Sequence, residues 1–190
     1  MAGRSAETAT DNILKPETMR KERVKRIVDI KLHPLAWRVL KEQYHYDGTA
    51  VELGGSWLYN VLTATLRRHP VIAPWEFSRM PQGLIDGRVY ISDYDYQRYG
   101  CYMSISKQIN FSMIVTKRER ERLCQLTATA HIMAGVSRDT AMRYFLEKEG
   151  YEDDEISFAT LRKHYQRHHR HFEEDMLHDL KELNNKNSHK

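Results

Sequence analysis

Polar and apolar residues recur at helical spacing through the second half of the chain, and this pattern predicts three helices. Thr116 and Glu119 form a capping-box pair, which predicts a helix beginning at Lys117. Ser137 is a favoured N-cap for a second helix, and Ser157 for a long third one. The positions expected on the packed faces are Leu123, Leu126, Ala130 and Met133 in the first helix, Ala141, Tyr144, Phe145 and Lys148 in the second, and Phe158, Leu161, Tyr165, Phe172, Met176, Leu180 and Leu183 in the third.

The first half mixes period-two and helical patterns. Residues 26–32 alternate as a half-buried strand, Pro34 begins a helix that a turn at Asp47-Gly48 follows, and Ser56 caps another helix. Prolines between 70 and 81 interrupt regular structure. Further elements are expected as a turn at Asp86-Gly87 and strands at residues 89–91, 99–105 and 109–115.

These elements predict an α+β fold that is mostly helical, in which a small N-terminal sheet packed with helices precedes a helical region ending in a long helix. The expected division is a disordered tail at residues 1–16, an α+β domain at 17–115, a helical region at 116–184 and a second tail at 185–190.

The junction between the first two C-terminal helices carries the most specific signal. Gly135 tolerates the positive φ of a helix end, Val136 is a small apolar residue, and Ser137 begins the next helix. This order resembles the helix-turn-helix of bacterial regulators over residues 117–149. His131 departs from the pattern, because alanine is usual where the two helices cross. Its side chain must tilt outward or spread the pair.

The resemblance implies that the helix over residues 137–149 enters the major groove of duplex DNA. Arg138 and Arg143 are the main expected contacts, because a guanidinium pairs bidentately with guanine or with phosphate. The full set of expected DNA-binding residues is Ser137, Arg138, Asp139, Met142, Arg143, Lys117, Arg118, Arg122, Arg162, Lys163, Arg167 and Arg170. The function expected is that of a sequence-specific or architectural DNA-binding regulator from a bacterial mobile element or phage; an ordinary helical hairpin is the alternative.

Charge leaves a second class of function open. The net charge of +4 favours a polyanionic partner, yet residues 116–190 hold 14 Lys and Arg against 14 Asp and Glu. The excess is concentrated in the basic run at residues 20–26. Charges in the C-terminal half alternate in blocks of opposite sign, which suit self-association as well as DNA binding. A non-enzymatic scaffold that oligomerises through the terminal helix is therefore the competing interpretation.

Histidines gather on one arc of the terminal helix. His164, His168, His171 and Asp175 are spaced to share a face, which makes them a candidate zinc site. No cysteine or His-Glu-x-x-His arrangement accompanies them, so the preferred interpretation is electrostatic: protonation would strengthen binding to an acidic partner as the pH falls. A nucleic-acid-processing enzyme using the cluster from His164 to His171 is a third hypothesis, although no motif assigns a catalytic residue or a cofactor.

Composition also bears on location. No apolar run approaches the roughly 20 residues that a membrane-spanning helix needs, and the polar N-terminal stretch lacks the apolar core of a secretory signal. Cys101 and Cys124 form no metal-ligand spacing. We therefore expect a cytoplasmic protein with no membrane partner and no evident small-molecule ligand.

Overall fold

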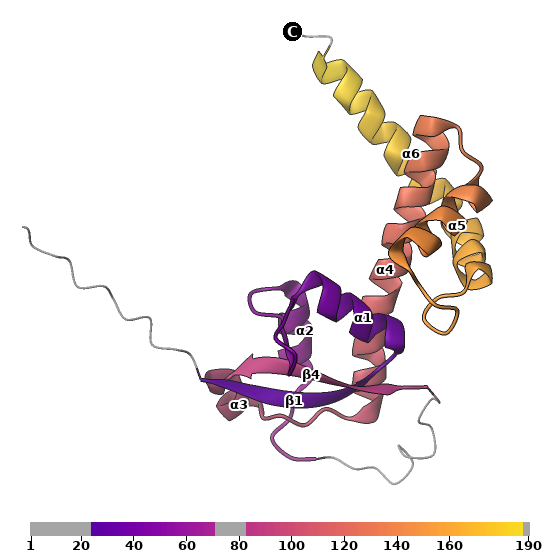
Figure 1. The fold of residues 1–190 in the computed structure, drawn as a ribbon. Coiled ribbons are helices and arrows are strands. Elements are labelled where there is room, and N and C mark those ends of the chain that lie inside the picture. The colour runs from indigo at the N-terminus through magenta and orange to yellow at the C-terminus, as the bar shows by residue number, and fades with distance from the viewer. Residues whose placement is uncertain (1–23, 71–82, 188–190) are drawn as a thin grey trace, which may run out of the picture.

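The computed structural model describes residues 24–70 and 83–187 (Figure 1). The expected N-terminal tail, most of the basic run at 20–26 and most of the proline-rich stretch lie outside these ranges. In chain order the elements are β1 (Lys25–Leu32), α1 (Pro34–Gln43), β2 (His45–Tyr46), β3 (Val51–Glu52), α2 (Trp57–Thr65), β4 (Ile85–Ser92), α3 (Asp93–Tyr99), α4 (Ile105–Ala134), α5 (Arg138–Glu149) and α6 (Phe158–Asn187).

The N-terminal part is built on a mixed four-stranded sheet of order β1-β4-β3-β2. β1 pairs with β4 in antiparallel register along its whole length, β4 pairs in parallel with β3, and β3 pairs in antiparallel with β2. Val28, Ile30 and Leu32 are buried, while the residues between them are exposed or half-buried. The alternation at residues 26–32 therefore predicted β1 correctly.

Local capping chemistry explains the first two helices. Pro34 occupies the first turn of α1, where its missing N–H costs no hydrogen bond. Ser56 accepts a hydrogen bond from the Tyr59 amide at 3.2 Å and so begins α2. Between these helices, Asp47 accepts from the amides of Thr49 and Ala50 and closes the expected turn.

Residues 99–115 differ from the expectation of two strands. α4 is one continuous helix of 30 residues beginning after Ser104, so no helix starts at Lys117 and no capping box forms. Thr116 lies inside this helix, where its hydroxyl donates to the Met113 carbonyl. Phe111 and Val115 are buried four residues apart, which is the helical spacing. The apolar run at 109–115 fits both periods, and packing on the sheet selects the helix.

Gly87 also differs from its expected role. It lies inside β4 rather than in a turn. A Cβ at this position would come within 2.8 Å of the Leu32 side chain and 3.1 Å of the Trp37 ring. Glycine there leaves room for Leu32 and Trp37 to pack closely on the strand and does not reverse the chain.

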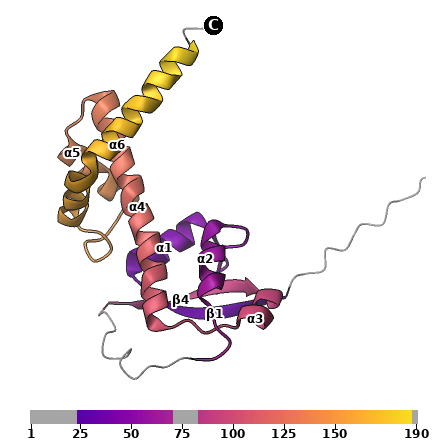
Figure 2. The same cartoon turned by 180° about the vertical axis from the view of Figure 1, so that it is seen from behind.

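α4 joins the sheet to the helical part. Figures 1 and 2 show it rising from the sheet beside α1 and continuing alongside α5 and α6, with which it is in contact. The domain boundary expected between residues 115 and 116 falls in the middle of this helix. A continuous set of buried side chains, from Val28 on β1 to Phe172 on α6, runs through both parts. The fold is α+β and mostly helical, as the sequence predicts, and α6 continues as helix through Asn187.

Two polar clusters hold the junction between the parts. Glu119 on α4 is 2% exposed and accepts hydrogen bonds from Arg122, Tyr151 and Gln43. Arg38 on α1 donates to the carbonyls of Glu149 and Gly150 and to the Glu155 carboxylate, so it caps the C-terminus of α5 from the neighbouring part. These contacts fix α5 relative to the sheet.

Candidate nucleic-acid interface

The α4–α5 corner has the geometry that the sequence predicts. Gly135 adopts φ +66° and ψ 13°, and its amide donates to the His131 carbonyl at 3.1 Å, which ends α4. Ser137 is extended and accepts from the Thr140 amide at 3.2 Å, which begins α5. Gly150 ends α5 at φ +66°. The two helices thus meet across a tight, well-capped turn.

His131 closes this corner instead of spreading it. The side chain is half-buried, and Nδ1 lies 2.9 Å from the carbonyl oxygen of Val136 in the turn. The imidazole therefore ties the last turn of α4 to the connection, a role that alanine has no polar atom to perform.

α5 buries one side against α4 and α6. Ala141, Met142 and Leu146 form that side, and Met142 is only 1% exposed. Met142 lies four residues before Leu146 and therefore shares its buried face. The expectation that Met142 faces DNA is wrong. Tyr144, expected on the packed side, is 55% exposed instead.

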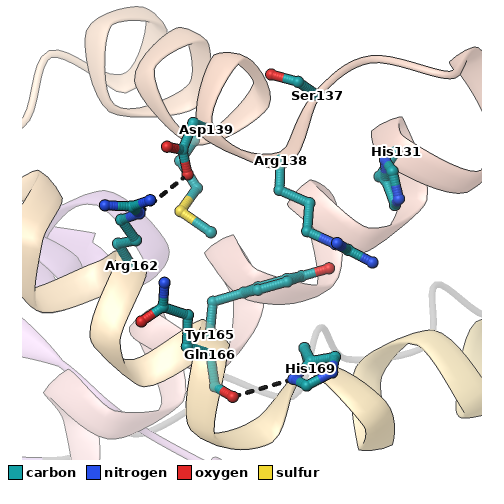
Figure 3. Close-up of a pocket in the computed structure, with 9 residues that line it drawn as sticks. His131, Ser137, Arg138, Asp139, Arg162, Tyr165, Gln166 and His169 are labelled. Atoms are coloured by element: carbon teal, nitrogen blue, oxygen red, sulfur yellow. Dashed lines mark hydrogen bonds and ion pairs between the residues drawn. The ribbon is translucent and has the colours of Figure 1, made fainter.

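An open hollow of about 480 Å³ lies between the first turn of α5 and α6 (Figure 3). Arg138 Nε lies 2.7 Å from Glu173 Oε1, and the same oxygen accepts a hydrogen bond from the Tyr165 hydroxyl at 2.9 Å. Asp139 Oδ1 lies 3.2 Å from Arg162 Nε. The residues lining the hollow are His131, Ser137, Arg138, Asp139, Met142, Arg162, Tyr165, Gln166 and His169.

Titration behaviour follows from this pairing. Burial works to raise the pKa of Glu173, but hydrogen bonds from Arg138 and Tyr165 outweigh it and lower the pKa. Burial, together with the Glu173 carboxylate, raises the pKa of Tyr165 to about 12. Glu173 is therefore ionised at neutral pH and neutralises Arg138, which is not a free phosphate contact in this structure.

Arg143 has a different environment from Arg138. Its guanidinium lies over the Phe158 ring, 4.0 Å from the centroid, and the residue stays exposed. A guanidinium stacked by its face still offers its N–H groups at the edge. The solvent side of α5 is formed by Thr140, Arg143, Tyr144, Glu147 and Lys148, with Glu147 as its single acid.

The three basic residues expected from α4 do not gather beside the first turn of α5. Lys117 lies 3.7 Å from Glu121, and the Arg118 guanidinium covers the Trp57 ring at 4.9 Å. Arg122 is committed to Glu119 and also lies 3.3 Å from Glu149. The expectation that Arg122 is available for phosphate is not supported by this pairing.

Three expected cations on α6 remain open to solvent. Lys163, Arg167 and Arg170 are exposed, and spacings of four and three place them on one face of the helix. None of them forms an ion pair with a residue in the described ranges. Arg162 belongs to the flank that faces α5 and is paired with Asp139.

The candidate zinc ligands form pairs rather than a chelating set. The His164 and His168 rings are 4.9 Å apart, while His171 lies 3.3 Å from Asp175. Within the described residues, no three His, Cys, Asp or Glu side chains are grouped to hold a metal ion.

Two residues of this surface were missing from the expected interface. Glu173 pairs with Arg138, and Tyr165 donates a hydrogen bond to the same carboxylate. From the sequence, Glu173 is expected only as part of an acidic block and Tyr165 only on the packed face of the terminal helix. The pairing spans 35 residues in sequence, so no local pattern indicates it.

No known family model, curated protein or solved structure matches this chain. None of the helices in the described ranges has both the length and the apolar character required to cross a bilayer.

Proposed function

We propose that this protein binds duplex DNA through the α4–α5 corner and acts as a regulator of the helix-turn-helix kind. The solvent side of α5, above all Thr140, Arg143 and Tyr144, contacts the groove. Lys163, Arg167 and Arg170 on α6 contact phosphates. Relative to the expectation from sequence, Met142 and Arg122 leave the contact set and Tyr144 enters it.

The observation that carries this proposal is the combination of a rigid corner with a solvent side of α5 on which Arg143 and Lys148 outnumber the single acid Glu147. Gly135, Ser137 and His131 fix the turn, and Met142 and Leu146 anchor α5 in the core. Arg143 is stacked on Phe158, and no carboxylate in the described part of the chain forms an ion pair with its guanidinium. A pre-positioned cation loses little side-chain entropy on binding phosphate or a base edge.

Arg138 is at most a weak DNA contact in this proposal, because its guanidinium is already paired. Its side chain is 43% exposed but paired with Glu173. DNA phosphate would have to compete with this carboxylate, which makes the first turn of α5 a weaker contact than its middle.

A reducing, cytoplasmic location fits the same proposal. Cys101 and Cys124 are both free thiols, and Cys124 is buried. Burial raises the pKa of the Cys124 thiol to about 12, so it stays protonated and unreactive at neutral pH.

A gel-shift titration with random-sequence duplex at two salt concentrations tests the function. We expect binding that weakens steeply with salt, and Arg143→Ala should weaken it by about 1 to 3 kcal/mol if this side chain reads a base. Single alanine variants of Lys163, Arg167 and Arg170 should each lower the salt slope by about one.

Lys107→Ala is the matched control for these variants, because Lys107 is an exposed cation at the sheet end of α4. Equal weakening by this control would indicate a nonspecific charge effect. Absence of binding at low salt would contradict the proposal.

An oligomeric scaffold is the second candidate, and one observation favours it. The C-terminal half of α6 projects beyond α4 and α5 (Figures 1 and 2). Leu177 is 45% exposed on this half. Sedimentation should then show a multimer that Leu180→Asp dissolves; a monomer at high concentration contradicts this candidate.

A further inference from the structure

A second hollow lies between α4 and α6, on the flank of α6 away from α5. It has a volume of about 340 Å³, and its walls carry Lys117, Glu121 and Gln125 from α4 with His164, His168 and His171 from α6. Phe172 completes the lining. We call it the histidine groove. Its lining includes none of the contacts proposed on α5 and none of Lys163, Arg167 and Arg170 on α6.

One buried polar atom of this lining, Nε2 of His164, has no hydrogen-bond partner in the structure, and neither has Nε of Arg120, which does not line the groove. Buried polar groups in native proteins are nearly always paired, and each exception calls for an explanation. The imidazole of His164 acquires a positive charge on protonation, so an anionic acceptor in the groove satisfies its Nε2.

Positive charge exceeds negative charge around His164. The groups that face it are His168 on its own helix and Lys117, Arg120 and Glu121 on α4. Glu121 is the one carboxylate among them, and it lies 3.7 Å from Lys117.

Arg120 has no compensating acid of its own. It forms no ion pair with a carboxylate of the described residues. It faces His33 just before α1, and Asp154 and Glu155 lie near that histidine.

The titration of these groups agrees with a site that lacks its counter-charge. Burial lowers the pKa of His164, and His168 and Arg120 lower it further. Burial also lowers the pKa of Arg120. Such an environment repels a metal cation and attracts an anion.

We propose that the histidine groove binds a tetrahedral oxyanion with two negative charges, a free phosphate or sulfate or the terminal phosphate of a phosphomonoester, between His164, His168 and Lys117. Arg120 supplies the charge behind His164. Binding is coupled to proton uptake, because the dianion favours the imidazolium form of His164. Affinity therefore rises as the pH falls.

Sulfate is the probe of choice, because its charge stays constant over the range in which histidine titrates, whereas inorganic phosphate changes its own protonation there. Histidine ring NMR signals of the full chain are followed at about pH 6 and about pH 8, around the ordinary histidine pKa. Chloride at equal ionic strength corrects for general salt effects. Glycerol phosphate in parallel separates a preference for a phosphomonoester from one for the free ion.

We expect saturable sulfate binding that moves the His164 signal and tightens about tenfold from the higher to the lower pH, as one added charge interaction predicts. His164→Gln and His168→Gln should each weaken it about tenfold. His178→Gln is the matched control on the same helix, since its partner is Glu182 outside the groove. No saturation at the lower pH, or equal weakening by His178→Gln, overturns the proposal.

Discussion

Removal of the buried carboxylate of Glu119 should loosen the junction between the sheet and the helical part. Glu119 Oε1 accepts from Arg122 Nε at 2.9 Å, from Arg122 Nη2 at 2.6 Å and from the Tyr151 hydroxyl at 2.6 Å, while Oε2 accepts from Gln43 Nε2 at 3.2 Å. The Glu119→Ala substitution leaves these donors without their acceptor and opens space for water at the meeting point of α1, α4 and the α5–α6 connection.

The free-energy cost of the substitution depends on whether each donor finds another acceptor. Gln43 is exposed and finds water, and Arg122 retains Glu149 at 3.3 Å. Tyr151 is half-buried, and burial together with Glu119 raises its pKa, so its hydroxyl loses most. Breaking a buried ion pair costs about 3 to 5 kcal/mol, and the partial exposure of Arg122 places this case near about 3 kcal/mol.

Urea unfolding of the full chain, followed by two spectroscopic probes, measures this loss. Glu119→Gln should cost less than alanine, because the amide keeps one acceptor oxygen. Glu121→Ala is the matched control: its partner Lys117 lies 3.7 Å away and is 72% exposed, so the cost should stay under about 0.5 kcal/mol. If Glu119→Ala costs no more than Glu121→Ala, the junction does not depend on this carboxylate.

Three further changes test other parts of the structure. Glu173→Gln should free Arg138, tighten duplex binding and steepen its salt slope by about one; an unchanged slope would mean that Arg138 never reaches phosphate. Gly100→Ala should destabilise the protein by more than about 2 kcal/mol in urea unfolding, because φ is +87° and the new Cβ would lie 2.3 Å from the Arg67 carbonyl oxygen. Gly48→Ala is its control: the new Cβ meets no atom, so the cost should be about 1 kcal/mol. Hydrogen bonds from the amides of Ala50 and Thr49 and from Tyr90 lower the pKa of Asp47 to about 2. The ionised Asp47 therefore stabilises the fold above its unfolded pKa of 3.8, and this stabilisation is lost as the pH falls through about 2. The difference in melting temperature between the unchanged protein and Asp47→Asn should close over that pH window.

Sequence reasoning succeeded where the cause is local. Ser56, Ser137 and Ser157 cap helices through their own hydroxyls, and Gly135 ends one through its own φ. Each of these signals is contained within four residues. Helix starts and the corner could therefore be predicted without the fold.

The failures have a different origin. Residues 109–115 satisfy two periodicities, and only the neighbouring sheet and α1 select the helix. Arg138 and Met142 were expected on one outward side, but contacts with α6 decide where each lies. Partners that are 35 residues away in sequence determine which charges stay open to a ligand. The site was therefore less predictable than the elements that form it.

The uninterrupted α4 has a mechanical consequence. At 1.5 Å per residue, its 30 residues form a rod of about 45 Å with the sheet near one end and the turn at Gly135 at the other. A tilt of about 5° at the sheet would sweep the far tip through about 4 Å, close to the spacing of successive base pairs. If α5 docks on DNA as proposed, a small change of angle where β1 and α1 pack on α4 becomes a shift at the α4–α5 corner comparable with one base-pair step.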